Sequence, residues 1–190
     1  MIQGLEIMAT TRLFTVEDIE QAPPEGHWEL IDGELVPVTP SGLESSGLGH
    51  RIGWIVGNFV YAHDLGMMTG ADGGYVLFPD RDTIRVPDVG FIREERLPPK
   101  GQRSRFPRLA PDLAIEVLSP SDSTSEVIAK IEMYQEAGIP LIWIVDPEKT
   151  TVTVISTGRP TVVLKPGDTL DGGDVLPGFS APVSDIFAAD

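Results

Sequence analysis

This chain of 190 residues contains no cysteine and only three histidines. The absence of thiols excludes a disulfide framework, a thiolate metal site and a cysteine nucleophile. Three histidines are too few to build a metal site from imidazole ligands alone. No run of about 18 apolar residues occurs either, so we expect no transmembrane helix. The first 14 residues lack a basic stretch followed by an apolar one, which predicts a cytoplasmic protein without a signal peptide.

Basic residues are also scarce. The chain has 14 Lys and Arg against 29 Asp and Glu, and its formal net charge is −15. Binding to nucleic acid depends on cations that replace the counterions of phosphates, so the protein as a whole should repel DNA. Two interpretations of one local cluster stay open: a solvated loop that offsets the acidic surface, or a phosphate-binding loop. The cluster consists of Arg93, Arg96, Lys100, Arg103, Arg105 and Arg108.

The hydrophobic pattern predicts one domain that alternates strands and helices. A composition of 41% hydrophobic and 23% charged residues is typical of globular proteins. We expect a single domain over residues 1–190, with 1–14 as a flexible or peripheral segment. The expected elements are a hairpin at 28–38, a helix at 47–65, a hairpin of 75–78 and 83–92, a strand at 112–118, a helix at 124–137, a strand at 141–145 and an edge strand at 151–156.

This order of elements predicts an α/β (α+β) domain with a mixed β-sheet. The two strands within 112–145 should be parallel and joined by a right-handed helical crossover. The Pro-rich, basic stretch 93–111 predicts a long loop. Gly49, Gly53 and Gly57 stand four residues apart in the first long helix, where each glycine lowers helix stability. They indicate a close backbone approach, and packing on the sheet is favoured over a contact between two copies of the chain.

Glu116 is the first residue that suggests chemistry. It lies in the apolar run Leu113-Ala-Ile-Glu-Val-Leu118. A buried carboxylate must be protonated, paired or bound to a cation, unless this one reaches solvent or a lysine at the strand end. Asp112 is about 13 Å away along the strand, too far to share an ion. Asp88 is the better partner, because Pro87 marks a bulge or strand end beside it. On neighbouring strands the two carboxylates would form a site for Mg²⁺ or Mn²⁺.

Lys130 is the third candidate residue. A crossover helix runs back along the strand that precedes it. Lys130 lies roughly 9 Å back along the helix, and Glu116 lies roughly 10 Å back along the strand. The ammonium can therefore reach the carboxylate pair, although Glu126 at i−4 would also suit an ordinary surface lysine. Two carboxylates, a cation site and a lysine are the components of metal-assisted phosphodiester hydrolysis.

Several motifs together resemble the bacterial putative restriction endonuclease family of the PD-(D/E)XK nuclease superfamily. The resemblance extends over about residues 15–187. Its most specific part is the Glu-Val-Leu-Ser-Pro-Ser block with the later lysine. The matching segments are Glu29-Leu-Ile-Asp-Gly-Glu34, Arg85-Val-Pro-Asp-Val-Gly-Phe-Ile92, Ala110-Pro-Asp-Leu-Ala-Ile-Glu-Val-Leu-Ser-Pro-Ser121, Lys130-Ile-Glu-Met-Tyr134, Trp143-Ile-Val-Asp-Pro147 and Leu176-Pro-Gly-Phe179.

The resemblance implies a restriction-endonuclease-like mixed sheet flanked by helices and a Mg²⁺-dependent endonuclease acting on DNA. It implies Asp88 as the motif aspartate and Glu116 as the motif acid. The superfamily lysine normally stands two positions after that acid, where this chain has Leu118. The resemblance implies that Lys130 takes its place from the following helix. The rival expectation is a catalytically inactive domain of the same fold that serves dimerisation or protein binding.

Further residues are secondary candidates. His50 matches a recurrent family position near a helix start, and Asp72 is either a turn former or a residue that lines the site. The loop 93–108 joins the strand of Asp88 to the strand of Glu116, so we expect it to border the cleft. Arg93, Arg103 and Arg105 are the expected phosphate contacts. Because cleavage of both strands of a duplex calls for one site per strand, we also expect a homodimer.

Overall fold

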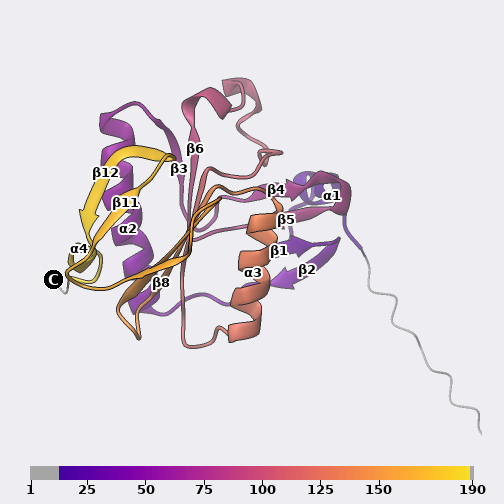
Figure 1. Ribbon diagram of the computed structural model, residues 1–190. Coiled ribbons are helices and arrows are strands. Elements are labelled where there is room, and N and C mark those ends of the chain that lie inside the picture. The colour runs from indigo at the N-terminus through magenta and orange to yellow at the C-terminus, as the bar shows by residue number, and fades with distance from the viewer. Residues whose placement is uncertain (1–12, 189–190) are drawn as a thin grey trace, which may run out of the picture.

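The computed structural model describes residues 13–188, and its centre is a six-stranded mixed sheet (Figure 1). The strand order is β10-β9-β8-β7-β6-β3. Only β7 and β8 run parallel within this sheet, with Leu113 opposite Leu141. The strands are β3 (Gly66–Thr69), β6 (Val89–Arg93), β7 (Leu113–Val117), β8 (Leu141–Asp146), β9 (Thr151–Ser156) and β10 (Val162–Leu164).

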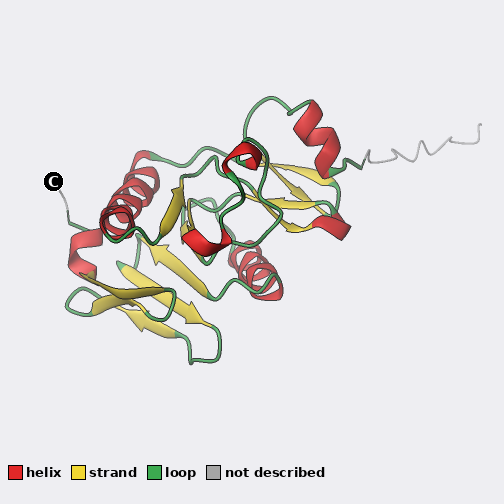
Figure 2. Ribbon diagram, turned by 90° about the horizontal axis from the view of Figure 1, so that it is seen from above, coloured by secondary structure: helices red, strands yellow, loops and turns green. Residues whose placement is uncertain are grey.

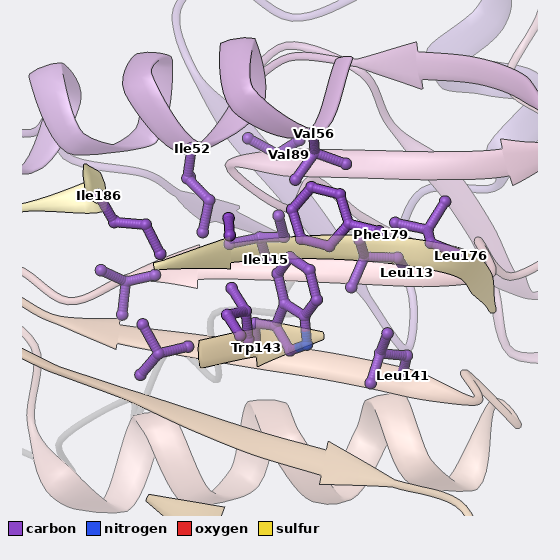
Figure 3. Close-up of a cluster of buried hydrophobic side chains, with 14 of the residues drawn as sticks. Ile52, Val56, Val89, Leu113, Ile115, Leu141, Trp143, Leu176, Phe179 and Ile186 are labelled. Atoms are coloured by element: carbon purple, nitrogen blue, oxygen red, sulfur yellow. The ribbon is translucent and has the colours of Figure 1, made fainter. Parts of the chain in front are cut away.

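Two long helices, α2 (Leu43–Ala62) and α3 (Thr124–Glu136), pack on opposite faces of this sheet. Alternation along β7 decides which side chain meets which helix. Leu113, Ile115 and Val117 enter the core under α2, whereas Ala114 packs in the cluster that contains Tyr134 of α3. Figure 3 shows the first cluster gathered between α2 and the sheet. Glu116 shares the parity of Ala114, and so it belongs to the face that α3 covers.

The helix α3 begins with a capping box in which Ser123 and Glu126 bond each other's backbone amides. Glu126 is therefore engaged at the helix start. The helix connects the parallel strands β7 and β8, as the sequence predicts for residues 112–145. The expected fold class, a mixed sheet flanked by helices, is confirmed.

A second, antiparallel sheet of order β2-β1-β5-β4 lies beside the first (Figure 2). With α1 it encloses its own small core, which includes Val16, Ile19 and Leu30. The predicted turn at Asp32-Gly33 is present, and both residues have positive φ. The elements are α1 (Val16–Gln21), β1 (Trp28–Ile31), β2 (Glu34–Pro37), β4 (Tyr75–Phe78) and β5 (Thr83–Arg85).

The C-terminal part of the chain forms a small hairpin and a short helix against α2. Phe179 of the hairpin packs edge-to-face on Phe59 of α2, with ring centroids 5.5 Å apart. These elements are β11 (Thr169–Gly172), β12 (Leu176–Pro182) and α4 (Val183–Ile186). Three short 3₁₀ turns complete the description: η1 (Pro79–Arg81), η2 (Glu94–Arg96) and η3 (Lys100–Gln102).

Two local expectations were wrong, and one strand was not predicted. The run 83–92 is not one strand: it breaks at Val86-Pro87-Asp88, β5 joins the small sheet and β6 joins the large one. Pro87 has no amide hydrogen to donate to a ladder, which accounts for the break. Strand β9 is not an edge strand, because β10 pairs outside it. The short strand β3 pairs with β6 and was not predicted.

Of the segment 1–14, which is expected to be flexible or peripheral, residues 1–12 lie outside the described residues. Phe14 is not peripheral: its amide donates to the carbonyl of Gly33, and its ring packs on the small core. Within residues 13–188, no helix is both long enough and apolar enough to cross a membrane.

The three glycines of α2 pack on the sheet, as predicted. A Cβ added to Gly49 would stand 3.7 Å from Val117, and one added to Gly53 would stand 3.3 Å from Val89. At Gly57 the same atom would stand 3.9 Å from Met68 of β3. The glycines thus bring α2 close to the strand ends that carry Asp88 and Glu116.

We expect Gly53→Leu to lower the free energy of unfolding by about 1–3 kcal/mol, because a larger side chain must push α2 away from Val89. Gly47 is the matched control, since it lies in the same helix with no atom within 4 Å of an added Cβ. Gly47→Leu should be neutral or stabilise by up to about 1 kcal/mol through helix propensity. Urea unfolding measures both, and equal effects at the two positions would contradict this packing.

Candidate functional site

A cavity of about 830 Å³ opens where α2, the start of β1 and the segment before β6 meet. Its wall includes Asp88 and Lys130, together with Glu29 of β1. Pockets that bind small ligands in proteins usually have volumes of about 300–1,000 Å³. Two of the three residues chosen from the sequence thus face one space, and the third, Glu116, lies behind the wall in contact with Lys130.

Asp88 stands in the bend between β5 and β6. Val89 pairs with Ile115 across the antiparallel strands, so the register continued by one position places Asp88 opposite Glu116. The Oδ2 atom of Asp88 accepts a hydrogen bond from the Val117 amide at 2.7 Å. Its Oδ1 atom has no hydrogen-bond partner among residues 13–188. Burial raises the pKa of Asp88, although the Val117 amide and the charge of Lys130 oppose that shift.

Glu116 is buried, with its side chain 11% exposed. Its Oε2 atom accepts a hydrogen bond from Lys130 Nζ at 2.7 Å, and its Oε1 atom accepts one from the Tyr134 hydroxyl at 2.5 Å. Burial raises the pKa of Glu116 to about 7; Lys130 opposes the shift, and the nearby charge of Asp88 adds to it. Glu116 is therefore a carboxyl group whose charge depends on the cations around it.

Lys130 projects from the face of α3 that covers β7. Besides Glu116, it has Glu29 as a neighbour, with Nζ 3.9 Å from Oε1. Burial by itself lowers the pKa of Lys130, but the charges of Glu116 and Glu29 outweigh burial and raise it. The ammonium is therefore charged at neutral pH. Its sequence neighbour Glu126 is engaged at the helix start instead, so the surface-lysine alternative does not describe Lys130.

Glu29 and Arg85 are site residues that sequence reasoning did not assign. Their side chains are 8% and 7% exposed, and Arg85 NH1 lies 2.9 Å from Glu29 Oε2. Glu29 Oε1 also accepts a hydrogen bond from the Val86 amide at 2.9 Å, two residues before Asp88. The Arg85 guanidinium lies 6.0 Å from the ring centroid of Tyr134. An arginine within the apolar run 84–92 is a signal of the same kind as Glu116 and could have revealed this pair.

His50 and Asp72 are both exposed and both line the cavity. His50 follows Gly49, the α2 residue whose added Cβ would stand 4.0 Å from the Cβ of Asp88. Asp72 lies in the turn between β3 and β4. Neither side chain makes a hydrogen bond or ion pair with another of the described residues. Both side chains therefore belong to the wall of the site and are not engaged elsewhere among the described residues.

The basic loop is arranged differently from the expectation. Arg93 is at the far end of β6 from Asp88, where its guanidinium donates to the Asp174 carbonyl, and the structure does not bring it to the cavity. The reason is topological: β6 and β7 are antiparallel, so the loop that joins them leaves from the opposite end of the sheet. Arg96 lies there too, 2.7 Å from the buried Asp112.

Arg103 and Arg105 lie nearer to the site without lining its cavity. They line a second cavity of about 460 Å³, which shares Thr69, Asp72 and Phe106 with the first. Arg103 Nε donates to a carbonyl of its own loop. Arg105 is loosely paired with Glu20 at 3.9 Å. Arg108, in the same loop, contacts both Glu17 and Glu20. Most of the cluster therefore offsets acidic groups of the protein itself.

The fit of a divalent cation depends on the two carboxylates. Residues 13–188 contain no group of three or more Asp, Glu or His side chains placed to hold a metal by themselves. Mg²⁺, however, is commonly held by one or two carboxylates plus waters and substrate phosphates. Asp88 Oδ1 is free for such a bond. Each oxygen of Glu116 has a second lone pair beyond its present hydrogen bond. The donor set therefore fits a hard divalent cation.

We expect the stability of the metal-free protein to fall as pH rises from about 5 to about 7. Over this range the folded protein keeps the proton of Glu116, whose pKa is about 7, whereas the unfolded chain has already released it. The total loss is about 3 kcal/mol. Glu116→Gln should remove most of this slope in urea unfolding with EDTA. Parallel pH profiles for the two proteins would contradict the raised pKa.

We expect Glu29→Ala to lower the free energy of unfolding by about 3 kcal/mol. Loss of the carboxylate leaves the buried guanidinium of Arg85 without its partner and the Val86 amide without its acceptor. Glu34 on the neighbouring strand β2 is the control, because it is exposed and Glu34→Ala should change stability by less than about 0.5 kcal/mol. Equal costs at the two positions would show that the Glu29–Arg85 pair is not a buried unit.

Comparison with known proteins gives the family. Residues 16–184 match the family model of Uma2, described as putative restriction endonuclease. Among solved structures, a putative nuclease belonging to DUF820 from Anabaena variabilis ATCC 29413 is similar. Its TM-score is 0.75 at 22% sequence identity, over 92% of this chain and 97% of that one. No curated protein sequence matches the chain. The fold, the match over most of the chain and the residues around Glu116 agree, and the chain belongs to the putative restriction endonuclease family.

Proposed function

We propose that this protein is a metal-dependent endonuclease that hydrolyses phosphodiester bonds of DNA. The observation that carries the proposal is the contact of Lys130 with Glu116, 2.7 Å long, directly behind a cavity whose wall presents Asp88. Membership of a nuclease family supports the same reaction class. A lysine beside two carboxylates at the wall of an open cavity has the chemistry to bind and cleave a phosphodiester.

Asp88 and Glu116 would hold the cation, Mg²⁺ or Mn²⁺. The bound ion supplies Lewis acidity, which polarises the phosphate and lowers the pKa of a bound water. The charge of the cavity wall supports this assignment. Asp72 and Asp88 line the cavity without an ion pair, and the one lysine of the described wall is already bound to Glu116, so an anionic phosphate is repelled unless a cation is added.

Lys130 provides positive charge at the cavity in addition to that of the cation. Glu116 and Glu29 keep its ammonium protonated and hold it in the cavity wall. From there it can donate to a non-bridging phosphate oxygen and stabilise the negative charge that develops in the transition state. Leu118 occupies the position two residues after Glu116 and cannot do this. The side chain of Glu116 lies on the face of β7 that α3 covers. A lysine on α3 therefore reaches the carboxylate that a lysine two residues later on the strand would contact in the superfamily pattern.

A second candidate function is a non-catalytic domain that serves dimerisation or protein binding. The observation that favours it is electrostatic: the net charge is −15, and Arg96, Arg105 and Arg108 are paired with carboxylates of the chain itself. This function predicts no cleavage under any metal condition. The expected homodimer is compatible with both candidates, and sedimentation equilibrium at micromolar concentrations tests it.

We expect the wild-type protein to nick supercoiled plasmid at low salt in Mg²⁺ or Mn²⁺ and to lose this activity in EDTA. Lys130→Ala should cut at least about 100-fold more slowly, the usual effect of removing one group that stabilises transition-state charge. Lys165→Ala is the matched control, because this exposed lysine lines neither cavity and should cut at the wild-type rate.

The same proteins separate the two candidate functions. Mn²⁺ should raise the melting temperature of the wild type and leave that of Asp88→Asn unchanged. A wild type that neither cuts nor is stabilised by the ion would favour the non-catalytic domain. Cleavage by Lys130→Ala at the wild-type rate would show that the activity does not come from this site.

A further inference from the structure

We propose that this site takes a strand with an unpaired nucleotide, and that Trp54 stacks on a base next to the phosphate that is cut. The inference rests on the proposed function and names its substrate class: single-stranded DNA, or a duplex with an opened or flipped-out nucleotide. It assigns Trp54 as a substrate-binding residue.

The first observation is the exposure of Trp54. The residue is 64% exposed on α2, yet it forms part of the wall of the cavity that contains Asp88 and Lys130. Trp28 and Phe106 also line this cavity, and their rings meet edge-to-face with centroids 6.2 Å apart. Trp28 is further fixed by a hydrogen bond from Nε1 to the Pro24 carbonyl. Trp54 has no ring partner among the described residues, so its face is available to a ligand.

The second observation is where α2 places this ring. Gly49 and Gly53 bring the helix against Asp88 and Val89. Trp54 follows Gly53 directly, so it stands beside the residues that pack on the start of β6. A nucleotide whose phosphate reaches Asp88 and Lys130 therefore has its base, or that of its neighbour, within reach of the indole. Stacking on an aromatic side chain is the usual way in which proteins hold single-stranded nucleic acid without reading its sequence.

The third observation is the size of the cavity. A cube of 830 Å³ has an edge of about 9 Å, and a B-DNA duplex is wider than this, because its major groove alone is roughly 12 Å across. An intact duplex cannot enter such a space. Glu116 is buried behind the wall, so the phosphate must come into the cavity to approach both carboxylates. A nucleotide drawn out of a helix, or one that was never paired, can do so.

The fourth observation is charge. Arg96 and Arg108, which could have contacted a duplex backbone, are engaged with Asp112 and with Glu17 and Glu20. Affinity for duplex DNA depends mainly on such cations, because they release counterions from the phosphates. Stacking has no such requirement, since every base offers a π-face whatever the charge of the protein. An acidic protein with an exposed indole in its cavity therefore favours an unpaired strand over an intact duplex.

The test compares three DNA probes of one sequence in Mg²⁺: a 20-nucleotide single strand, its perfect duplex, and the duplex with a central mismatched bubble. The variants are Trp54→Ala, Trp54→Phe and the control Tyr61→Ala. Tyr61 is also aromatic, on α2 and 59% exposed, but it does not line the cavity. Initial rates give kcat/KM for each probe. Titration with the single strand follows quenching of tryptophan fluorescence, which does not depend on cleavage.

We expect the wild type to cut the single strand and the bubble faster than the duplex. Trp54→Ala should reduce kcat/KM on these two probes about 5- to 100-fold, whereas Trp54→Phe keeps a ring and most of the rate. Tyr61→Ala should match the wild type. The single strand should quench the wild-type fluorescence, and most of this quenching should be lost in Trp54→Phe, in which only Trp28, fixed against Phe106, and the buried Trp143 emit.

Two results overturn this inference and leave the nuclease in place. One is faster cutting of the perfect duplex with no effect of Trp54→Ala, and the other is an equal loss in Tyr61→Ala. If the wild type cuts none of the three probes, the proposed function fails. Quenching that Trp54→Phe largely removes would then still support strand binding at this residue. No cleavage together with no quenching overturns both proposals.

Discussion

The structure of the site depends on one constraint: a carboxylate is buried in the middle of the principal sheet. Glu116 stands on β7, which has neighbours on both sides and a helix over each face. Such a group costs several kcal/mol unless partners are supplied. Lys130 and Tyr134, one turn apart on α3, supply them at 2.7 and 2.5 Å. The register of α3 on the sheet is therefore fixed by charge as well as by apolar packing.

The second sheet contributes residues to this network of charged groups. Pro87 ends the pairing of β5 and lets the chain cross from the small sheet to the large one within three residues, the last of which is Asp88. Glu29 of the small sheet accepts the Val86 amide of this crossing and lies 3.9 Å from Lys130. The small sheet thus holds both the segment that positions Asp88 and the lysine that faces it. A substitution that shifts one sheet should therefore also move groups that pack on the other, because Glu29 lies between them.

What the sequence predicts well is local. The apolar run around Glu116, the crossover of residues 112–145 and the turn at Asp32-Gly33 follow from patterns of a few residues. Lys130 follows from the rise of one helix along one strand. Glu29 and Arg85 were missed because their pairing joins β1 to β5, more than fifty residues apart. Arg85 within its apolar run indicates a buried charge, but no local pattern identifies Glu29 as its partner. The position of Arg93 was predicted wrongly. Asp88 precedes β6 and Arg93 ends it, so the loop that joins β6 to the antiparallel strand β7 begins at the end of β6 away from Asp88.

The placement of the basic loop determines how the proposed nuclease would bind DNA. Arg93 and Arg96 flank the buried Asp112 at the far end of the sheet, and Arg108 joins the loop to α1. These arginines pair with carboxylates away from the cavity and contribute little to the field inside it, where Lys130 is the one Lys or Arg among the described lining residues. In the proposed nuclease, charge neutralisation of a bound phosphate would come from Lys130 and a divalent cation together. The affinity for the rest of the strand would then come from contacts that do not depend on charge, and the aromatic rings of the cavity wall are the groups that can supply them.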